Sequence, residues 1–96
     1  MIIRFHSEAR KEFFRAVEFY EEQVVGLGYE FIDEVEKVLE VIEANPNSGT
    51  KITNSERRFL VSRFPYGVIY TAIPNQIFIF AVMDLRRKPG YWTSRK

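Results

Sequence analysis

Arg57–Asp84 has the sequence R-R-F-L-V-S-R-F-P-Y-G-V-I-Y-T-A-I-P-N-Q-I-F-I-F-A-V-M-D and contains three apolar runs of strand length. Two turn signals, Pro65-Tyr66-Gly67 and Pro74-Asn75, separate the runs. Connections this short join strands that pair antiparallel. The stretch therefore predicts a three-stranded antiparallel meander.

The last run of the meander is apolar on both faces. Strict alternation would place one set of side chains on one face, Ile77, Ile79, Ala81 and Met83, and a second set on the other, Phe78, Phe80 and Val82. A strand with two apolar faces is typical of the middle of a sheet, or of a surface that a partner covers.

Upstream of the meander, two stretches carry apolar residues at helical spacing. After a short strand at residues 2–5, Ser7 is the predicted N-cap of the first helix, and Gly26 and Gly28 are expected to end it. The second helix is expected to end at Asn45-Pro46. The apolar stripe of the first helix is Ala9, Phe13, Val17, Tyr20 and Val24, with Glu8, Glu12, Arg15, Glu18 and Glu22 expected on the opposite face. The stripe of the second is Leu27, Phe31, Val35, Val38 and Ile42, with Glu30, Asp33, Glu34, Lys37 and Glu40 expected outside.

A polar, turn-rich segment at 47–56 is predicted to be a loop with Ile52 as its apolar anchor. The whole pattern predicts an α+β fold, in which an N-terminal strand and a helical hairpin pack on one face of a mainly antiparallel sheet. Nothing else in the chain is large enough to cover the second face completely. Part of that face is therefore expected to be exposed or bound.

The 96 residues are enough for one domain, 1–96, and too few for two cores. The absence of cysteine excludes disulfides and thiolate chemistry, and no His/Asp/Glu spacing suggests a metal site, so we expect no cofactor. No run approaches the roughly 18 apolar residues of a membrane span, and the N-terminus lacks a signal-peptide core. A cytoplasmic protein that does not enter the membrane is expected.

The net charge of +1 conceals an asymmetry. Residues 1–45 hold eleven acids and five bases, a balance of −6, whereas residues 46–96 hold two acids and nine bases, a balance of +7. A basic field on part of a small domain attracts phosphates or acidic protein surfaces. The alternative is that each half only solvates its own surface.

The C-terminal stretch, residues 84–96, combines five bases with two aromatic residues. Arg86 or Arg87 could clamp a phosphate, because a guanidinium offers parallel N–H donors. Tyr91 and Trp92 could stack on a base or fill a partner's pocket. Alternatively, the two aromatic rings fold back onto the sheet edge and leave the arginines in solvent.

Three more arginines, Arg57, Arg58 and Arg63, are predicted in the first strand of the meander. Arg63 is the best candidate to join the C-terminal arginines, whereas the other two would serve equally well as edge charges that prevent aggregation. His6, the only histidine, is predicted to be a cap or surface residue rather than a general base. Acidic clusters on the helices are interpreted as solvated surface.

Two motifs make the chain similar to a known family. They are the F-P-Y-x-x-x-Y turn within Arg57–Tyr70 and the R-x-P-x-Y-W ending within Ala81–Trp92. The opening F-H-S-x-A at residues 5–9 adds to them. In these features the chain resembles the RelE/ParE superfamily of toxins from bacterial toxin–antitoxin systems, and its ParE-like branch in particular.

The resemblance implies a small α+β toxin that a cognate antitoxin neutralises by wrapping the helical hairpin and the sheet. ParE-like members inhibit DNA gyrase by binding, whereas RelE-like members cut mRNA on the ribosome. Gyrase is the expected target, with target-binding residues Arg86, Arg87, Tyr91, Trp92 and Arg95. A toxin fold that has lost its toxicity is a further alternative.

For the RelE-like alternative, the candidate catalytic residues are Arg63, Arg86, Arg87 and Tyr91. RNA cleavage also requires a general base, and no residue here aligns with one. Where the family commonly has histidine, this chain has Asp84, whose charge would repel phosphate unless Arg86 or Arg87 pairs with it. Whether the protein is an enzyme is left open, and binding without catalysis is favoured.

Overall fold

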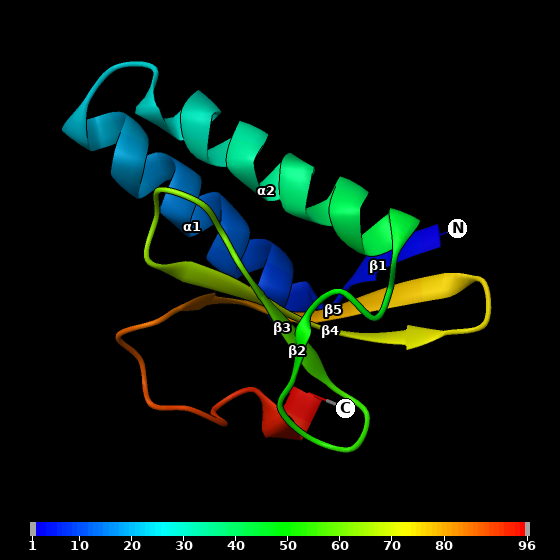
Figure 1. The fold of residues 1–96 in the computed structure, drawn as a ribbon. Coiled ribbons are helices and arrows are strands. Elements are labelled where there is room, and N and C mark those ends of the chain that lie inside the picture. The colour runs from blue at the N-terminus through cyan, green and yellow to red at the C-terminus, as the bar shows by residue number, and fades with distance from the viewer. Residues whose placement is uncertain (1, 96) are drawn as a thin grey trace.

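The computed structural model describes residues 2–95, which form two helices packed on a five-stranded sheet. The elements are β1 (Ile2–Phe5), α1 (Ser7–Gln23), α2 (Leu27–Ala44), β2 (Thr50–Lys51), β3 (Arg57–Leu60), β4 (Tyr66–Ile73), β5 (Gln76–Asp84) and a 3-10 turn at Thr93–Arg95. Both helices cover one face of the sheet, and the C-terminal segment crosses the other face (Figure 1). The predicted α+β fold is confirmed.

The strand order is β1-β5-β4-β3-β2. Strands β2 to β5 pair antiparallel, whereas β1 lies parallel to β5, with Ile2 opposite Gln76 and Phe5 opposite Ile79. Strand β5 therefore has a neighbour on each side, as its two apolar faces predict. None of the helices within 2–95 has the length and apolar character needed to cross a membrane.

A β-bulge in β5 breaks the alternation predicted for this strand. Ile69 pairs with Ala81 and Tyr70 with Ile79, which leaves Phe80 as an extra residue. Beyond the bulge the two faces exchange, so Val82 joins Ile79 in the core beneath the helices, and Ala81 joins Phe80 on the other face. The strict alternation expected from the sequence is wrong from Ala81 onward.

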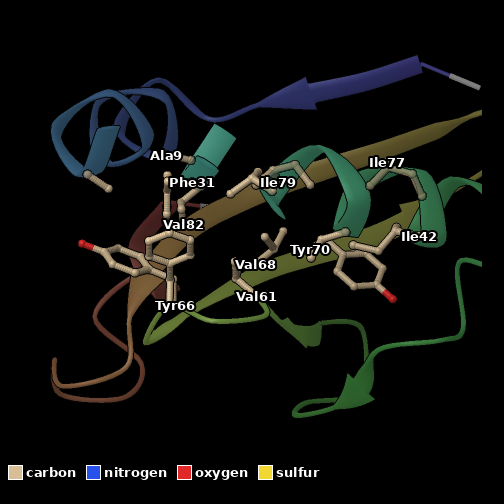
Figure 2. Close-up of a cluster of buried hydrophobic side chains, with 14 residues drawn as sticks. Ala9, Phe31, Ile42, Val61, Tyr66, Val68, Tyr70, Ile77, Ile79 and Val82 are labelled. Carbon is tan, nitrogen blue, oxygen red and sulfur yellow. The ribbon is translucent and has the colours of Figure 1, made fainter. Parts of the chain in front are cut away.

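The core between the helices and the sheet has an aromatic end, with Phe31 and Tyr66, and an end where Tyr70 lies beside the aliphatic residues Ile42 and Ile77 (Figure 2). Phe31 is fully buried at the aromatic end, where its ring contacts the rings of Tyr20, Phe64 and Tyr66. At the other end, Tyr70 donates a hydrogen bond from its hydroxyl to the carbonyl of Pro46 at 2.7 Å. The segment that follows α2 is thereby anchored to β4.

The helical hairpin differs from its predicted form at three points. His6, not Ser7, caps α1, because its Nδ1 accepts a hydrogen bond from the Glu8 backbone N–H at 3.0 Å. Gly28 lies inside α2 rather than between the helices, and Val24 is 60% exposed. The carboxylate of Glu21 on α1 caps α2 by accepting from the N–H groups of Gly26 and Gly28.

The segment at 47–56 is not entirely a loop, since it contains the two-residue strand β2, which pairs with β3. Its predicted anchor, Ile52, does pack against the cluster on the second face. Glu56, at the end of this polar segment, is only 2% exposed, and its carboxylate accepts from the hydroxyls of Thr53 and Ser55. These bonds close the turn that leads into β3.

Gly28 marks the close contact between the two helices. A Cβ at this position would lie 2.8 Å from the Val17 carbonyl oxygen and 2.9 Å from Oε1 of Glu21. Gly28→Ala is therefore expected to lower the free energy of unfolding by about 1–3 kcal/mol, although the same change inside an unobstructed helix raises it. Urea denaturation tests this, with the exposed Glu40→Ala as a control expected to change stability by at most about 0.5 kcal/mol. Equal or greater stability of the Gly28→Ala protein would contradict the proposed contact.

Candidate functional site

A hollow of about 380 Å³ lies between α1 and the end of β5. Charged, aromatic and aliphatic residues from α1, β4, β5 and the C-terminal segment line it: Glu12, Arg15, Ala16, Phe19, Tyr66, Val82, Asp84, Arg86 and Arg87. Three of these residues are arginines, so a basic rim surrounds an aromatic and aliphatic floor. This is the composition expected of a surface that binds a macromolecule.

The carboxylate of Glu12 lies at the centre of the site and is buried. Its Oε1 accepts from the backbone N–H of Val82 at 3.1 Å and from Arg95 at 2.9 Å. Its Oε2 accepts from Arg87 at 3.3 Å, from the Tyr91 hydroxyl at 2.7 Å and from Arg95 at 3.0 Å. One carboxylate on α1 thus binds three side chains of the C-terminal segment and one strand.

The reason for this arrangement is the short length of β1. Strand β1 ends at Phe5 opposite Ile79, so the edge of β5 beyond that point has no neighbouring strand within residues 2–95. Glu12 accepts from the N–H of Val82, and Arg95 donates to the carbonyl of Phe80 at 3.0 Å. The Glu12–Arg95 ion pair therefore supplies the hydrogen bonds that a longer β1 would have made, which satisfies buried backbone groups.

Two guanidinium groups lie close to the Tyr91 ring. The Arg87 guanidinium lies 3.7 Å from the centre of the Tyr91 ring and that of Arg95 lies 5.0 Å from it. Burial, followed by the hydrogen bond to Glu12, raises the pKa of the Tyr91 hydroxyl far above its ordinary value. Tyr91 therefore stays protonated and acts as a fixed donor to Glu12.

Asp84 and Arg86 form a second pair at the rim. The Arg86 side chain donates to both carboxylate oxygens of Asp84, at 2.9 and 2.7 Å, and its backbone N–H also donates to Oδ1. The Arg86 hydrogen bond is the main cause of a lowered pKa of Asp84. Of the two arginines that the sequence offers as partners for Asp84, the structure selects Arg86.

The predicted site residues divide into two groups. The structure brings Arg86, Arg87, Tyr91 and Arg95 to one place, around Glu12 and the hollow. Trp92 is 3% exposed and packs on Phe80 against the second face of the sheet. This agrees with the alternative in which the Trp92 ring folds back onto the sheet.

Arg63 lies apart from this site. It follows β3 rather than lying within it, has a backbone φ of +72°, and binds Glu30 and Glu34 of α2. Glu34, expected on the outer face of α2, is buried at this contact. The prediction that Arg63 continues the strand alternation is wrong, because the chain turns before it.

The prediction that Glu12 lies on the polar face of α1 away from the core is wrong, because its carboxylate is buried, and neither Glu12 nor Arg15 is among the predicted site residues. The signal for Glu12 is present, since it falls between Ala9 and Ala16 at helical spacing on the buried stripe of α1. An acid flanked by small buried residues on such a stripe indicates a buried partner of opposite charge. Arg15 sits one turn further along α1 and carries no comparable sequence signal.

Comparison with known proteins identifies the family. A family model described as the ParE toxin of the type II toxin-antitoxin system, parDE, matches residues 3–89. The chain belongs to the ParE toxin family. The resemblance to the RelE/ParE superfamily and its ParE-like branch is thereby confirmed, although Tyr91, Trp92 and Arg95 lie beyond the matched residues of this ParE-family chain.

A solved structure agrees with this ParE assignment at the level of the fold. It is described as the chromosomal ParDE TA system from P. aeruginosa and aligns with a TM-score of 0.72 at 13% identity. The alignment covers 90% of this chain and 97% of that one. A comparison with curated protein sequences finds no match.

Removing the charge of Glu12 should release the C-terminal segment of this ParE-family toxin. Glu12→Gln leaves Arg87 and Arg95 without their carboxylate, so we expect the free energy of unfolding to fall by about 3 kcal/mol. The fluorescence of Trp92, the only tryptophan, should shift to longer wavelength as the ring gains solvent. Glu18→Gln on the exposed side of α1 is the matched control. Unchanged fluorescence and stability in Glu12→Gln would show that the carboxylate does not hold the segment.

Proposed function

We propose that this protein is a toxin that inhibits DNA gyrase by binding and is neutralised by a cognate antitoxin. The observation that carries the proposal is the ParE family match over residues 3–89. The structure supports it with an exposed basic rim, made by Arg15, Arg86 and Arg87 around the hollow. Arginine and aromatic residues placed together are the side chains that contribute most binding energy at protein interfaces.

The geometry also favours binding over acid–base catalysis. Both oxygens of Glu12 already accept hydrogen bonds from the protein, so this carboxylate is poorly available as a general base. Tyr91, whose pKa is raised, is a poor proton donor near neutral pH. His6 caps α1 with Nδ1. The residues nearest the arginine rim therefore suit recognition of a partner better than RNA cleavage.

The gyrase proposal is tested by DNA supercoiling with purified gyrase. Wild-type protein should inhibit supercoiling of relaxed plasmid, and Arg86→Ala should raise the half-inhibitory concentration about tenfold, the loss typical of an interface arginine. Arg4→Ala, which removes an exposed arginine of β1 outside the hollow, should inhibit like the wild type.

Two outcomes would contradict this function. Undiminished supercoiling in the presence of folded protein, together with cuts in translated mRNA, would favour the RelE-like alternative. If the protein affects neither gyrase nor mRNA and its expression leaves growth unchanged, the protein has the fold of a toxin but has lost the toxicity.

The antitoxin is expected to cover apolar side chains that the fold leaves exposed on the helical hairpin. Five of these are at least 49% exposed: Phe14, Phe19, Val24, Val25 and Tyr29. Such a set of exposed apolar residues is typical of a surface that binds a partner.

Co-expression with the adjacent reading frame tests the antitoxin partner. A stable complex should elute as one peak in size-exclusion chromatography and should no longer inhibit gyrase. Separate elution of the two proteins, with inhibition unchanged, would contradict the pairing.

A further inference from the structure

A second hollow, of about 290 Å³, lies on the face of the sheet opposite the helices. Ile69 of β4 and Met83 of β5 belong to the buried cluster that underlies it. The segment before β3 contributes Ile52, and the C-terminal segment contributes Trp92. The hollow is therefore a groove between two irregular segments over an apolar floor, and Arg58 of β3 is the only charged residue among the described ones that line it.

Arg58 differs from the other arginines near the sheet because its donors are unused. Its Nε is buried and has no hydrogen-bond partner, and nothing within residues 2–95 forms an ion pair with its guanidinium. By contrast, Arg57 donates to the carbonyls of Asn47 and Gly49, and Arg95 binds Glu12. No described residue has to be released before this guanidinium binds an acceptor, so its terminal nitrogens are available to a ligand.

The position of the Arg58 side chain is fixed by Gly67 on the neighbouring strand β4. A Cβ at Gly67 would lie 3.2 Å from Cγ and 3.3 Å from Cδ of Arg58, so the arginine stem occupies the space that a larger residue would fill. Packing of the stem holds the guanidinium at the groove rather than leaving it free in solvent. The donor is therefore preorganised, which lowers the entropic cost of binding.

We propose that this groove binds a peptide segment of the antitoxin in which an acidic side chain neighbours a large apolar one. The carboxylate binds the two terminal nitrogens of the Arg58 guanidinium, and the apolar side chain packs on Ile69 and Met83. A carboxylate matches the fork of a guanidinium in charge and geometry. The inference rests on the proposed antitoxin partner and names one place where it docks.

A peptide carboxylate suits the groove better than a nucleic-acid strand does. Nucleic acids are bound through several phosphates, each requiring a cation, and their affinity depends on that number. Of the described residues that line this groove, Arg58 alone carries a positive charge, and the floor is apolar. One guanidinium above an apolar floor matches one carboxylate beside one apolar side chain.

Isothermal titration calorimetry with the purified protein encoded by the adjacent reading frame tests the inference. Arg58→Met keeps a side chain of similar length and removes the donors, and should weaken binding at least about tenfold, the loss typical of a charge-assisted hydrogen bond. Lys51→Met, on β2, removes the same charge outside the groove and should change Kd less than about threefold. Circular dichroism checks that both variants are folded.

A double-mutant cycle identifies the carboxylate and covers the case in which Arg58→Met perturbs the fold. Each acidic residue of the partner is changed to its amide, and one of these changes should reproduce the loss while adding little to Arg58→Met. Fully additive losses at every acidic position would overturn the inference, as would a Kd for Arg58→Met within about twofold of the wild type. The inference also falls if Arg58→Met instead weakens binding of a labelled RNA oligonucleotide.

The two proposals fail in different ways. If the adjacent protein binds wild type and Arg58→Met equally, antitoxin pairing stands and only the assignment of the groove falls. If the adjacent protein does not bind the wild type at all, both fall.

Discussion

The buried carboxylate of Glu12 is the interaction on which the arrangement of the C-terminal segment depends. A single ionised group in a largely apolar setting must be compensated by charge and hydrogen bonds, and here Arg95, Arg87, Tyr91 and the Val82 N–H provide them. The compensation joins α1, β5 and the chain end. The segment needs no long helix or strand of its own to be ordered, because one residue of α1 fixes it to the sheet edge.

The arginines of the two hollows differ in whether a carboxylate is paired with them. Beside α1, Arg86 and Arg87 already have carboxylate partners in Asp84 and Glu12. On the opposite face, Arg58 has no partner within residues 2–95. The first surface therefore has to exchange these partners to bind another protein, whereas the second has no ion pair to break. A toxin that must bind both a target and an inhibitor can use two surfaces of this kind separately.

Most of the fold follows from local sequence signals, and the departures have physical causes. Periodicity locates the helices and the meander because their stripes face one core. The bulge at Phe80 has no local signal in the sequence. Every residue from Ile77 to Met83 is apolar, so this run fits a regular strand and a bulged strand equally well, and the pairing with β4 decides between them. Arg63 departs from its predicted place because a left-handed residue there turns the chain, a conformation rare for arginine. Glu12 escapes sequence reasoning because its partners lie at the other end of the chain.

The parallel pairing of β1 with β5 has a consequence for how the protein is made. Ile2 pairs with Gln76, and Glu12 binds Arg95 across 83 positions of sequence. Contacts this distant form late, since a long loop must first be closed. Neither contact can form before Gln76 and Arg95 have been synthesised and have left the ribosome. During synthesis, β1 and Glu12 therefore remain without these partners until the later part of the chain is available.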